Sequence, residues 1–205
     1  MTRKRAKRGA TYGSALPSAS TQRLAGAAGS AGWPAEPRLG VDIGRVLISA
    51  GDTRGDTSFI SGSDEQALLT PPMPGAFEVI RELVPLFGGR VWLVSKCGPK
   101  VQQRSLRWLK RWDFYGITGV RPDRVLFCKE RHQKADHCAR HRISHFVDDR
   151  ADVLQHLNGM VPWLYLYGPQ RHAPPVWCEH VENWRQVRAR IRQSLASETL
   201  AVPAL

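Results

Sequence analysis

The chain lacks long apolar runs and paired cysteines. None of its apolar stretches approaches the ~18 consecutive residues that a membrane-spanning helix requires, so we expect no membrane span. No apolar segment follows the basic residues 2–8, which argues against a secretory signal. The four cysteines, at positions 97, 128, 138 and 178, form no CxxC pair. We therefore expect free thiols and a cytoplasmic location.

Acidic residues are also scarce. The chain has 30 Lys and Arg against 18 Asp and Glu, which gives a formal net charge of +12 and a pI of about 10.2. Residues 1–38 hold seven of these basic residues and one acid, Glu36, in a sequence rich in Ala, Gly, Ser and Thr. We therefore expect residues 1–37 to form a disordered basic arm. Three interpretations of the arm stay open: a solvated tail, a weak contact for nucleic acid or an acidic membrane, and an organellar transit peptide.

The rest of the sequence has the size and composition of one domain without internal repeats, and 42% of the whole chain is hydrophobic. Apolar runs predict strands at 39–41, 91–94, 125–128, 144–147 and 161–167, with 46–48 continuing or resuming the first. Apolar spacings of three and four predict helices at 76–84, 100–112, 132–142 and 180–196, the first of them ended by Pro85. Residues 49–70 have the composition of a long loop or a small flap. This alternation of strands and helices indicates an α/β fold, a Rossmann-like parallel sheet flanked by helices.

Three carboxylates follow predicted strands of this sheet. Asp148 and Asp149 end the apolar run at 144–147, and Asp42 ends the run at 39–41. Two adjacent like charges are mutually costly unless a cation neutralises them. Because the carboxyl ends of parallel strands meet at one edge of a sheet, we expect a Mg²⁺ site there.

These acids belong to a larger set of polar positions that occur in a particular order. The set consists of Asp42 within residues 41–47, Ser95 after the strand at 91–94, a lysine that is Lys134 or Lys129, and Asp148–Asp149 within residues 146–150. Residues 72–76, Pro-Met-Pro-Gly-Ala, open the helix between the first two positions. In this set and order the chain resembles the haloacid dehalogenase (HAD) superfamily of Asp-nucleophile phosphatases. The resemblance covers residues 38–170 as a catalytic core and leaves residues 171–205 as a C-terminal extension with a helix.

The resemblance implies a role for each of these residues. Asp42 would attack phosphorus and form an aspartyl-phosphate. Mg²⁺ would be held by Asp42, the main-chain carbonyl of Gly44 and Asp149, with Asp148 assisting. Substrate phosphate would be contacted by Ser95, Lys96 and Arg45, while Lys134 or Lys129 would balance the charge of the reacting groups. Lys134 begins a helix-like stretch ahead of the Asp148 strand, which favours it over Lys129.

The chain departs from the family pattern at Gly44. Family phosphatases usually carry a second Asp there, which protonates the leaving oxygen and later activates water. Positioned acid–base catalysis contributes ~10²–10⁴ in rate, so its loss predicts a slow enzyme, a substrate with a good leaving group, or a protein that binds without catalysis. The short insertions after Asp42 and Ser95 predict no large cap domain and an open site.

Each of two other residue clusters allows a functional and a purely structural interpretation. A group of His and Cys side chains could hold zinc: Cys128, His132, His137, Cys138, His141 and His145. The competing interpretation is a basic, polar helix surface beside the site. Trp108 and Trp112, flanked by basic residues, could form a base-stacking platform, or they could pack inward from an amphipathic helix.

The sequence thus predicts a Mg²⁺-dependent phosphatase acting through Asp42 on a phosphorylated small molecule or nucleotide. The alternatives are a catalytically impaired binding or scaffolding module and a phosphatase of nucleotides or nucleic-acid ends. No sequence feature specifies an oligomeric state.

Overall fold

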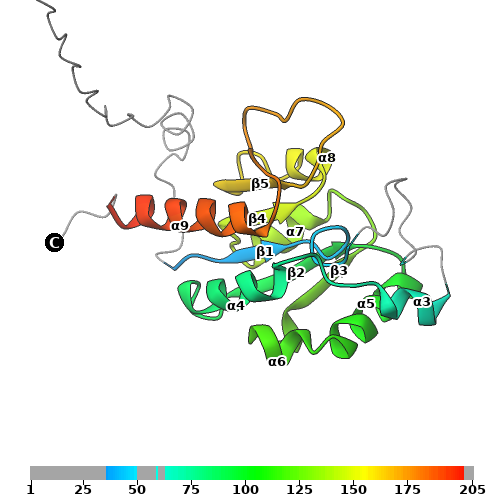
Figure 1. The fold of residues 1–205 in the computed structure, drawn as a ribbon. Coiled ribbons are helices and arrows are strands. Elements are labelled where there is room, and N and C mark those ends of the chain that lie inside the picture. The colour runs from blue at the N-terminus through cyan, green and yellow to red at the C-terminus, as the bar shows by residue number, and fades with distance from the viewer. Residues whose placement is uncertain (1–35, 50–58, 60–62, 201–205) are drawn as a thin grey trace, which may run out of the picture.

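The protein is built on one six-stranded sheet in which all neighbouring strands run parallel. A computed structural model describes residues 36–49, 59 and 63–200 and gives the strand order β3-β2-β1-β4-β5-β6 (Figure 1). The strands are β1 Leu39–Val41, β2 Val91–Lys96, β3 Val125–Cys128, β4 His145–Asp148, β5 Trp163–Tyr167 and β6 Glu179–Val181. The helices are α3 Asp64–Leu69, α4 Ala76–Leu86, α5 Pro99–Arg111, α6 Phe114–Thr118, α7 Lys134–Arg140, α8 Ala151–Gln155 and α9 Trp184–Leu200, with a 3₁₀ turn, η1, at Pro122–Arg124. The expected Rossmann-like parallel sheet flanked by helices is therefore confirmed.

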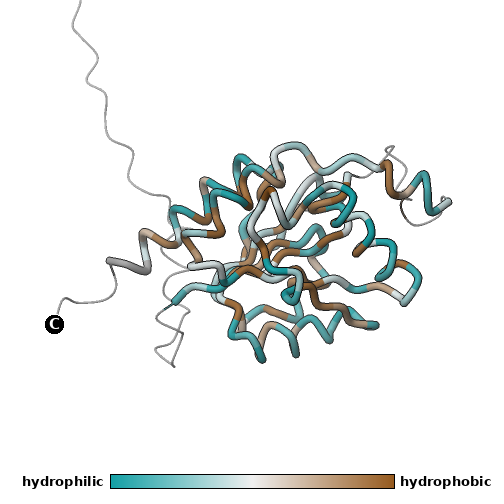
Figure 2. The backbone as a smooth tube through the Cα atoms, turned by 90° about the horizontal axis from the view of Figure 1, so that it is seen from below, coloured by the Kyte–Doolittle hydropathy of each residue, from teal (hydrophilic) through white to brown (hydrophobic). Residues whose placement is uncertain are grey.

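Two helical layers cover the sheet. Helices α4, α5, α6 and α9 pack on one face, and α7 and α8 pack on the other (Figure 1). Successive side chains of a strand point to opposite faces, so each strand serves both layers. In β2, Leu93 belongs to the core cluster under α4, whereas Trp92 and Val94 belong to the cluster under α7. Figure 2 shows the resulting pattern, with hydrophobic strands at the centre and hydropathy that alternates along the helices.

The central strand, β1, contains a glycine for a packing reason. Gly40 pairs in register with Phe146 of β4. A Cβ atom on Gly40 would collide with the Phe146 ring and would also crowd Ile143. The absent side chain therefore leaves room for the Phe146 ring to cover β1 on the α7 face, where it is fully buried.

Two local expectations were wrong. Residues 46–48 form no strand: Val46 and Leu47 lie in a turn, and Ile48 makes only isolated bridges to Gly44 and Pro72. These apolar residues are buried because a loop carries them into the core. Helix α4 does not end before Pro85 but runs through it to Leu86. Pro85 has no N–H to donate to the carbonyl of Arg81, and the helix ends one residue later.

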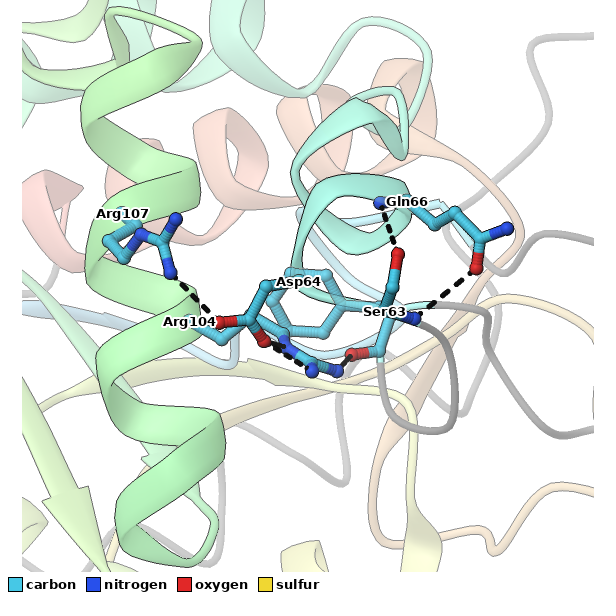
Figure 3. Close-up of polar contacts among 6 residues, drawn as sticks. Ser63, Asp64, Gln66, Arg104 and Arg107 are labelled. Carbon is cyan, nitrogen blue, oxygen red and sulfur yellow. Dashed lines mark hydrogen bonds and ion pairs between the residues drawn. The ribbon is translucent and has the colours of Figure 1, made fainter.

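Several short elements were not anticipated, among them α3, α6 and β6. Within the expected loop at 49–70, the described residues include α3, which begins with a capping box between Ser63 and Gln66 (Figure 3). Residues 50–58 and 60–62 of that loop and the predicted arm, apart from residues 36 and 37, lie outside the described residues. Beyond residue 170, β6 pairs in parallel with β5, and the last helix begins at Trp184 rather than at residue 180.

The C-terminal segment is built into the core. Trp184, Val187 and Ile191 of α9 are buried in the same cluster as α4. The Trp184 Nε1–H donates a hydrogen bond of 2.9 Å to the carbonyl of Val46, in the loop that follows β1. The stretch expected as an extension therefore supports the carboxyl edge of the central strand.

Helix α5 turns its aromatic residues inward. Trp108 is fully buried and donates from Nε1 to the carbonyl of Thr70, while Trp112 donates to the carbonyl of Leu68. The base-stacking platform is therefore wrong, and the amphipathic interpretation is confirmed. The part of the chain that the structure describes contains no large cap domain, and none of its helices is long and apolar enough to cross a bilayer.

One histidine of β4 lies in the middle of the core. His145 is fully buried, and its ring stacks on Tyr165. Its Nδ1 and Nε2 atoms form hydrogen bonds of 2.9 Å with the hydroxyl oxygens of Ser144 and Ser194. Burial lowers the pKa of His145 to about 3, because the charged imidazolium loses its hydration. His145 is therefore a neutral core residue rather than a zinc ligand.

We predict that His145 makes the fold sensitive to acid. Its pKa is lower in the folded than in the unfolded state, so the unfolded chain binds more protons and stability falls as pH drops below about 6.5. Between pH 7 and pH 5 the wild type should lose about 2 kcal/mol more unfolding free energy than His145→Gln. Urea denaturation at both pH values measures this difference. Equal pH dependence in the two proteins would contradict it.

Candidate active site at the carboxyl edge of the sheet

The polar residues predicted for the site meet at the carboxyl ends of three adjacent strands. Asp42 directly follows β1, Ser95 lies near the end of β2, and Asp148 is the last residue of β4. The ladder places Val41 beside Val147, and the main-chain N–H of Asp42 donates to the Val147 carbonyl at 2.9 Å. The sheet therefore brings together acids that lie about a hundred residues apart in the sequence.

A buried lysine lies between two of these acids. Lys134, the first residue of α7, places Nζ 2.6 Å from Asp42 Oδ1 and 2.7 Å from Asp148 Oδ2. Only 2% of its side chain is exposed. Burial disfavours the ammonium charge, but the carboxylates of Asp148 and Asp42 outweigh this effect and raise the pKa of Lys134 above its usual value. Lys129, the other candidate, is exposed and forms no part of this arrangement.

The carboxyls of the cluster carry more negative charge than the lysine balances. Burial raises the pKa of Asp148 above its usual value, although Lys134 opposes the shift. Burial and the nearby Asp42 raise the pKa of Asp149 to about 6, against the pull of Arg45, whose Nε lies 3.2 Å from Asp149 Oδ2. Asp148 and Asp149 therefore hold protons more tightly than isolated carboxyls do.

The donor set suits a hard divalent cation. Asp42, Asp148 and Asp149 each present an oxygen within 4.8 Å of the others, and two of the three residues are buried. Carboxylate and carbonyl oxygens are the ligands that Mg²⁺ takes in proteins. Lys134 and the half-exposed Arg45 supply two positive charges to three carboxylates, so an additional cation would relieve their repulsion.

A cavity of about 390 Å³ opens above the acids. Its wall includes all the residues expected at the site except Lys129, namely Asp42, Gly44, Arg45, Ser95, Lys96, Lys134, Asp148 and Asp149. Sequence reasoning missed other lining residues, among them Arg131, Arg150 and Phe59. Arg150 directly follows the acidic pair, so its position was a usable signal. No pattern in the sequence indicated Phe59, which is brought to the cavity by tertiary packing.

The loop after β1 is held from several sides. Arg45 adopts φ 60°, a left-handed conformation that is uncommon for a long side chain, and its guanidinium pairs with Asp149. The Trp184 Nε1–H donates a hydrogen bond to the carbonyl of Val46. The main-chain N–H of Met73 donates a hydrogen bond of 2.7 Å to the carbonyl of Leu47. These contacts fix the loop from which Gly44 and Arg45 line the cavity.

The His and Cys residues do not form a second metal centre. His137 Nε2 forms a hydrogen bond with the Phe127 carbonyl, and Cys128 donates its thiol to the Ser95 carbonyl. Burial raises the pKa of the Cys138 thiol to about 12. Within residues 36–49, 59 and 63–200, the aspartate cluster is the one group of three or more such side chains close enough to share an ion. The zinc alternative is therefore wrong, and all four cysteines are free thiols as expected.

The fold is similar to that of a known hydrolase. No family model and no curated protein matches the sequence. Among solved structures, the chain resembles a haloacid dehalogenase-like family hydrolase from Xanthomonas campestris with a TM-score of 0.54 and 13% sequence identity. The match covers 80% of this chain and 98% of that one. The likeness shows that the chain has a HAD-like fold.

We predict that replacing Lys134 destabilises the protein and that Mg²⁺ restores part of the loss. Lys134→Met leaves two buried carboxylates without their cation, and breaking a buried ion pair in this way costs about 3 kcal/mol. A divalent cation bound by the same acids should compensate in part. Urea denaturation with and without Mg²⁺ measures both effects.

Lys129→Met is the matched control because it removes an equivalent charge from an exposed position nearby. It should change the free energy of unfolding by less than ~0.5 kcal/mol. Equal stability of the two variants would show that the Lys134 contacts contribute little to folding.

Proposed function

We propose that the protein is a Mg²⁺-dependent phosphatase of the HAD type that hydrolyses phosphate monoesters through Asp42. The observation that supports this most strongly is the position of Lys134, whose Nζ lies 2.6 Å from Asp42 Oδ1 and 2.7 Å from Asp148 Oδ2 at the base of the cavity. A buried cation beside a carboxylate that faces a cavity suits attack on an anionic group. The HAD-like fold and the donor set of Asp42, Asp148 and Asp149 agree with this proposal.

Asp42 is placed to act as the nucleophile. Its side chain is largely buried, lines the cavity and is held by Lys134 through Oδ1. This hydrogen bond orients the carboxylate and leaves its other oxygen available for attack. When bound at the acids, Mg²⁺ supplies positive charge that offsets the repulsion between the carboxylate and the phosphoryl group.

The neighbouring residues bind and orient the phosphoryl group. The Ser95 hydroxyl can donate a hydrogen bond to a phosphoryl oxygen, because Ser95 lines the cavity from the adjacent strand. Lys96 and Arg45 add positive charge at the same wall. Asp148 is fixed by two contacts, the ammonium of Lys134 and the N–H of Arg150 at 3.0 Å from Oδ1. The Ser95 hydroxyl and the positive charges of Lys96 and Arg45 can stabilise negative charge that develops on the phosphoryl group.

The direct test is Mg²⁺-dependent phosphate release from a panel of esters that includes nucleotides. We expect wild-type activity that requires Mg²⁺, and a loss of at least ~10³-fold in Asp42→Asn, because the amide cannot attack phosphorus. Ser95→Ala should lower kcat by about tenfold or more through the loss of one hydrogen bond to the phosphoryl group. Rapid acid quenching with a labelled ester should trap phosphate on wild type and not on Asp42→Asn.

Lys129→Met serves here as the control for charge removal near the site, and it should keep wild-type kcat and KM. If wild type and Asp42→Asn both fail to release phosphate from every ester, the phosphatase proposal is wrong. Mg²⁺ binding that persists in such an inactive protein would support the binding-module alternative, which Gly44 favours.

A further inference from the structure

The carboxyls that line the cavity all belong to the aspartate cluster. Among the described residues, no acid other than Asp42, Asp148 and Asp149 faces this space. The other polar lining groups are hydroxyls, a thiol, Lys side chains and guanidinium groups, which ordinarily titrate well above neutral pH. Burial raises the pKa of the Cys97 thiol further, to about 11. Efficient general-acid catalysis needs a group that titrates near the working pH, so outside the aspartate cluster of Asp42, Asp148 and Asp149 the described cavity lining offers no such donor for a leaving oxygen.

By the resemblance to the HAD superfamily, Gly44 stands where phosphatases of that family usually carry an acid, and packing does not require a glycine there. A Cβ atom on Gly44 would meet only Asp42 Oδ2, at 3.8 Å, which is an ordinary van der Waals distance. Its backbone is also outside the left-handed region that favours glycine. The missing side chain therefore removes a chemical function rather than relieving a steric conflict.

One wall of the cavity is apolar. Ile43, Ile48, Phe59 and Val101 line the cavity there and pack together in one core cluster. Phe59 is 4% exposed, and its carbonyl accepts a hydrogen bond of 2.5 Å from Arg104 Nη1. Arg104 is in turn held by Asp64 of α3 through Nε and Nη2, at 3.0 and 2.6 Å (Figure 3).

The Asp64 carboxylate also accepts from Arg107 Nη1 at 2.9 Å, so two arginines of α5 hold the start of α3 (Figure 3). Because Arg104 itself is 2% exposed, this contact fixes the backbone at residue 59 relative to α5. The aromatic side chain is therefore held at the cavity wall. An aromatic group of a substrate would find a packing partner there.

Resting on the phosphatase function proposed above, we infer that the substrate is the phosphate ester of a phenol. A phenol such as tyrosine ionises near pH 10, far more easily than an aliphatic alcohol, so the phenolate departs without receiving a proton. The ring would lie against Phe59 and the aliphatic wall while the phosphoryl group faces Asp42. The absent acid and the apolar wall thus favour the same class of ester.

The reaction balances without a proton donor in its first step. Asp42 forms a bond to phosphorus, the bond between phosphorus and the phenolic oxygen breaks, and the phenolate keeps the electron pair. Water then attacks the phosphorus of the aspartyl-phosphate, which returns the Asp42 carboxylate and yields dihydrogen phosphate. A proton of that phosphate passes through solvent to the phenolate.

A leaving-group series tests the inference. We expect kcat/KM to rise steeply as the pKa of substituted phenols falls, and to be at least ~100-fold higher for phenyl phosphate than for an alkyl phosphate of similar size. Gly44→Asp should raise kcat/KM for the alkyl ester at least tenfold over Gly44→Asn and flatten the series. Asn matches Asp in size and cannot donate an acidic proton, so the pair isolates the acid.

Phe59→Ala tests the apolar wall separately. It should raise KM for phenyl phosphate several-fold with little change in kcat, because the ring contact is made equally in the ground and transition states. KM for acetyl phosphate, which has a good leaving group and no ring, should not change. Leu69→Ala is the matched control, because Leu69 is exposed on α3 and does not line the cavity.

The outcomes separate this inference from the phosphatase proposal. Mg²⁺-dependent activity lost in Asp42→Asn, together with a flat series or a preference for alkyl esters, retains the phosphatase and overturns the phenol inference. A higher kcat/KM for acetyl phosphate than for every aryl phosphate also overturns it. No activity toward any ester in wild type overturns both.

Discussion

The arrangement of acids at the carboxyl edge of this sheet depends on one buried ammonium group, that of Lys134. Three carboxylates converge there because parallel strands end together, and burial makes each of their charges expensive. Lys134 Nζ reaches two of them at 2.6 and 2.7 Å, from the first residue of α7. The start of this helix must therefore lie against the edge of the sheet. The packing of the α7 layer and the electrostatics of the site depend on the same contact.

Two titratable residues of β4 illustrate how position along a strand decides charge. His145 lies at the start of the strand, surrounded by aromatic rings and hydroxyls, and its lowered pKa keeps it neutral. Asp148 lies at the end, equally buried, but the edge of the sheet gives it Lys134 and the main-chain N–H of Arg150. Their acid sensitivities have opposite signs, because the folded state disfavours protonation of His145 and favours protonation of Asp148. The four residues of β4 therefore begin with a structural residue, His145, and end with a residue of the site, Asp148.

The cavity has a charged base and an apolar wall, and different layers build them. The base comes from the strand ends of the sheet, whereas Phe59 is held through α3 and α5 by the contact between Asp64 and Arg104. The C-terminal helix contributes indirectly, since Trp184 bonds to the loop after β1. Gln170, beyond β5, donates to the carbonyl of Asp149 at 3.3 Å. Segments far from the predicted catalytic residues therefore position the groups that face the cavity.

The sequence by itself determined the fold class, the positions of the first five strands along the chain and the acids that gather at the sheet edge. These features are local: apolar runs and helical spacings predict the elements, and a carboxylate directly after a strand has only one edge of a parallel sheet to occupy. The resemblance to the HAD superfamily added Ser95 and Gly44 to the same edge. It also supplied the two lysine candidates, both of which lie near strands or helices in the sequence.

The sequence favoured Lys134 over Lys129, but only the tertiary structure shows that Lys134 is buried between two acids and that Lys129 is exposed, because burial and proximity do not appear in local sequence. The tertiary structure also showed that residues 46–48 form a loop. They are buried by contacts with distant segments rather than by strand pairing. Short β6 and α3 carry too few residues for a periodic signal, and each is stabilised by its neighbours. Tertiary contacts also determine which apolar residues line the cavity. Phe59 is an isolated aromatic in the sequence, and it faces the site because Arg104, 45 residues away, binds its carbonyl.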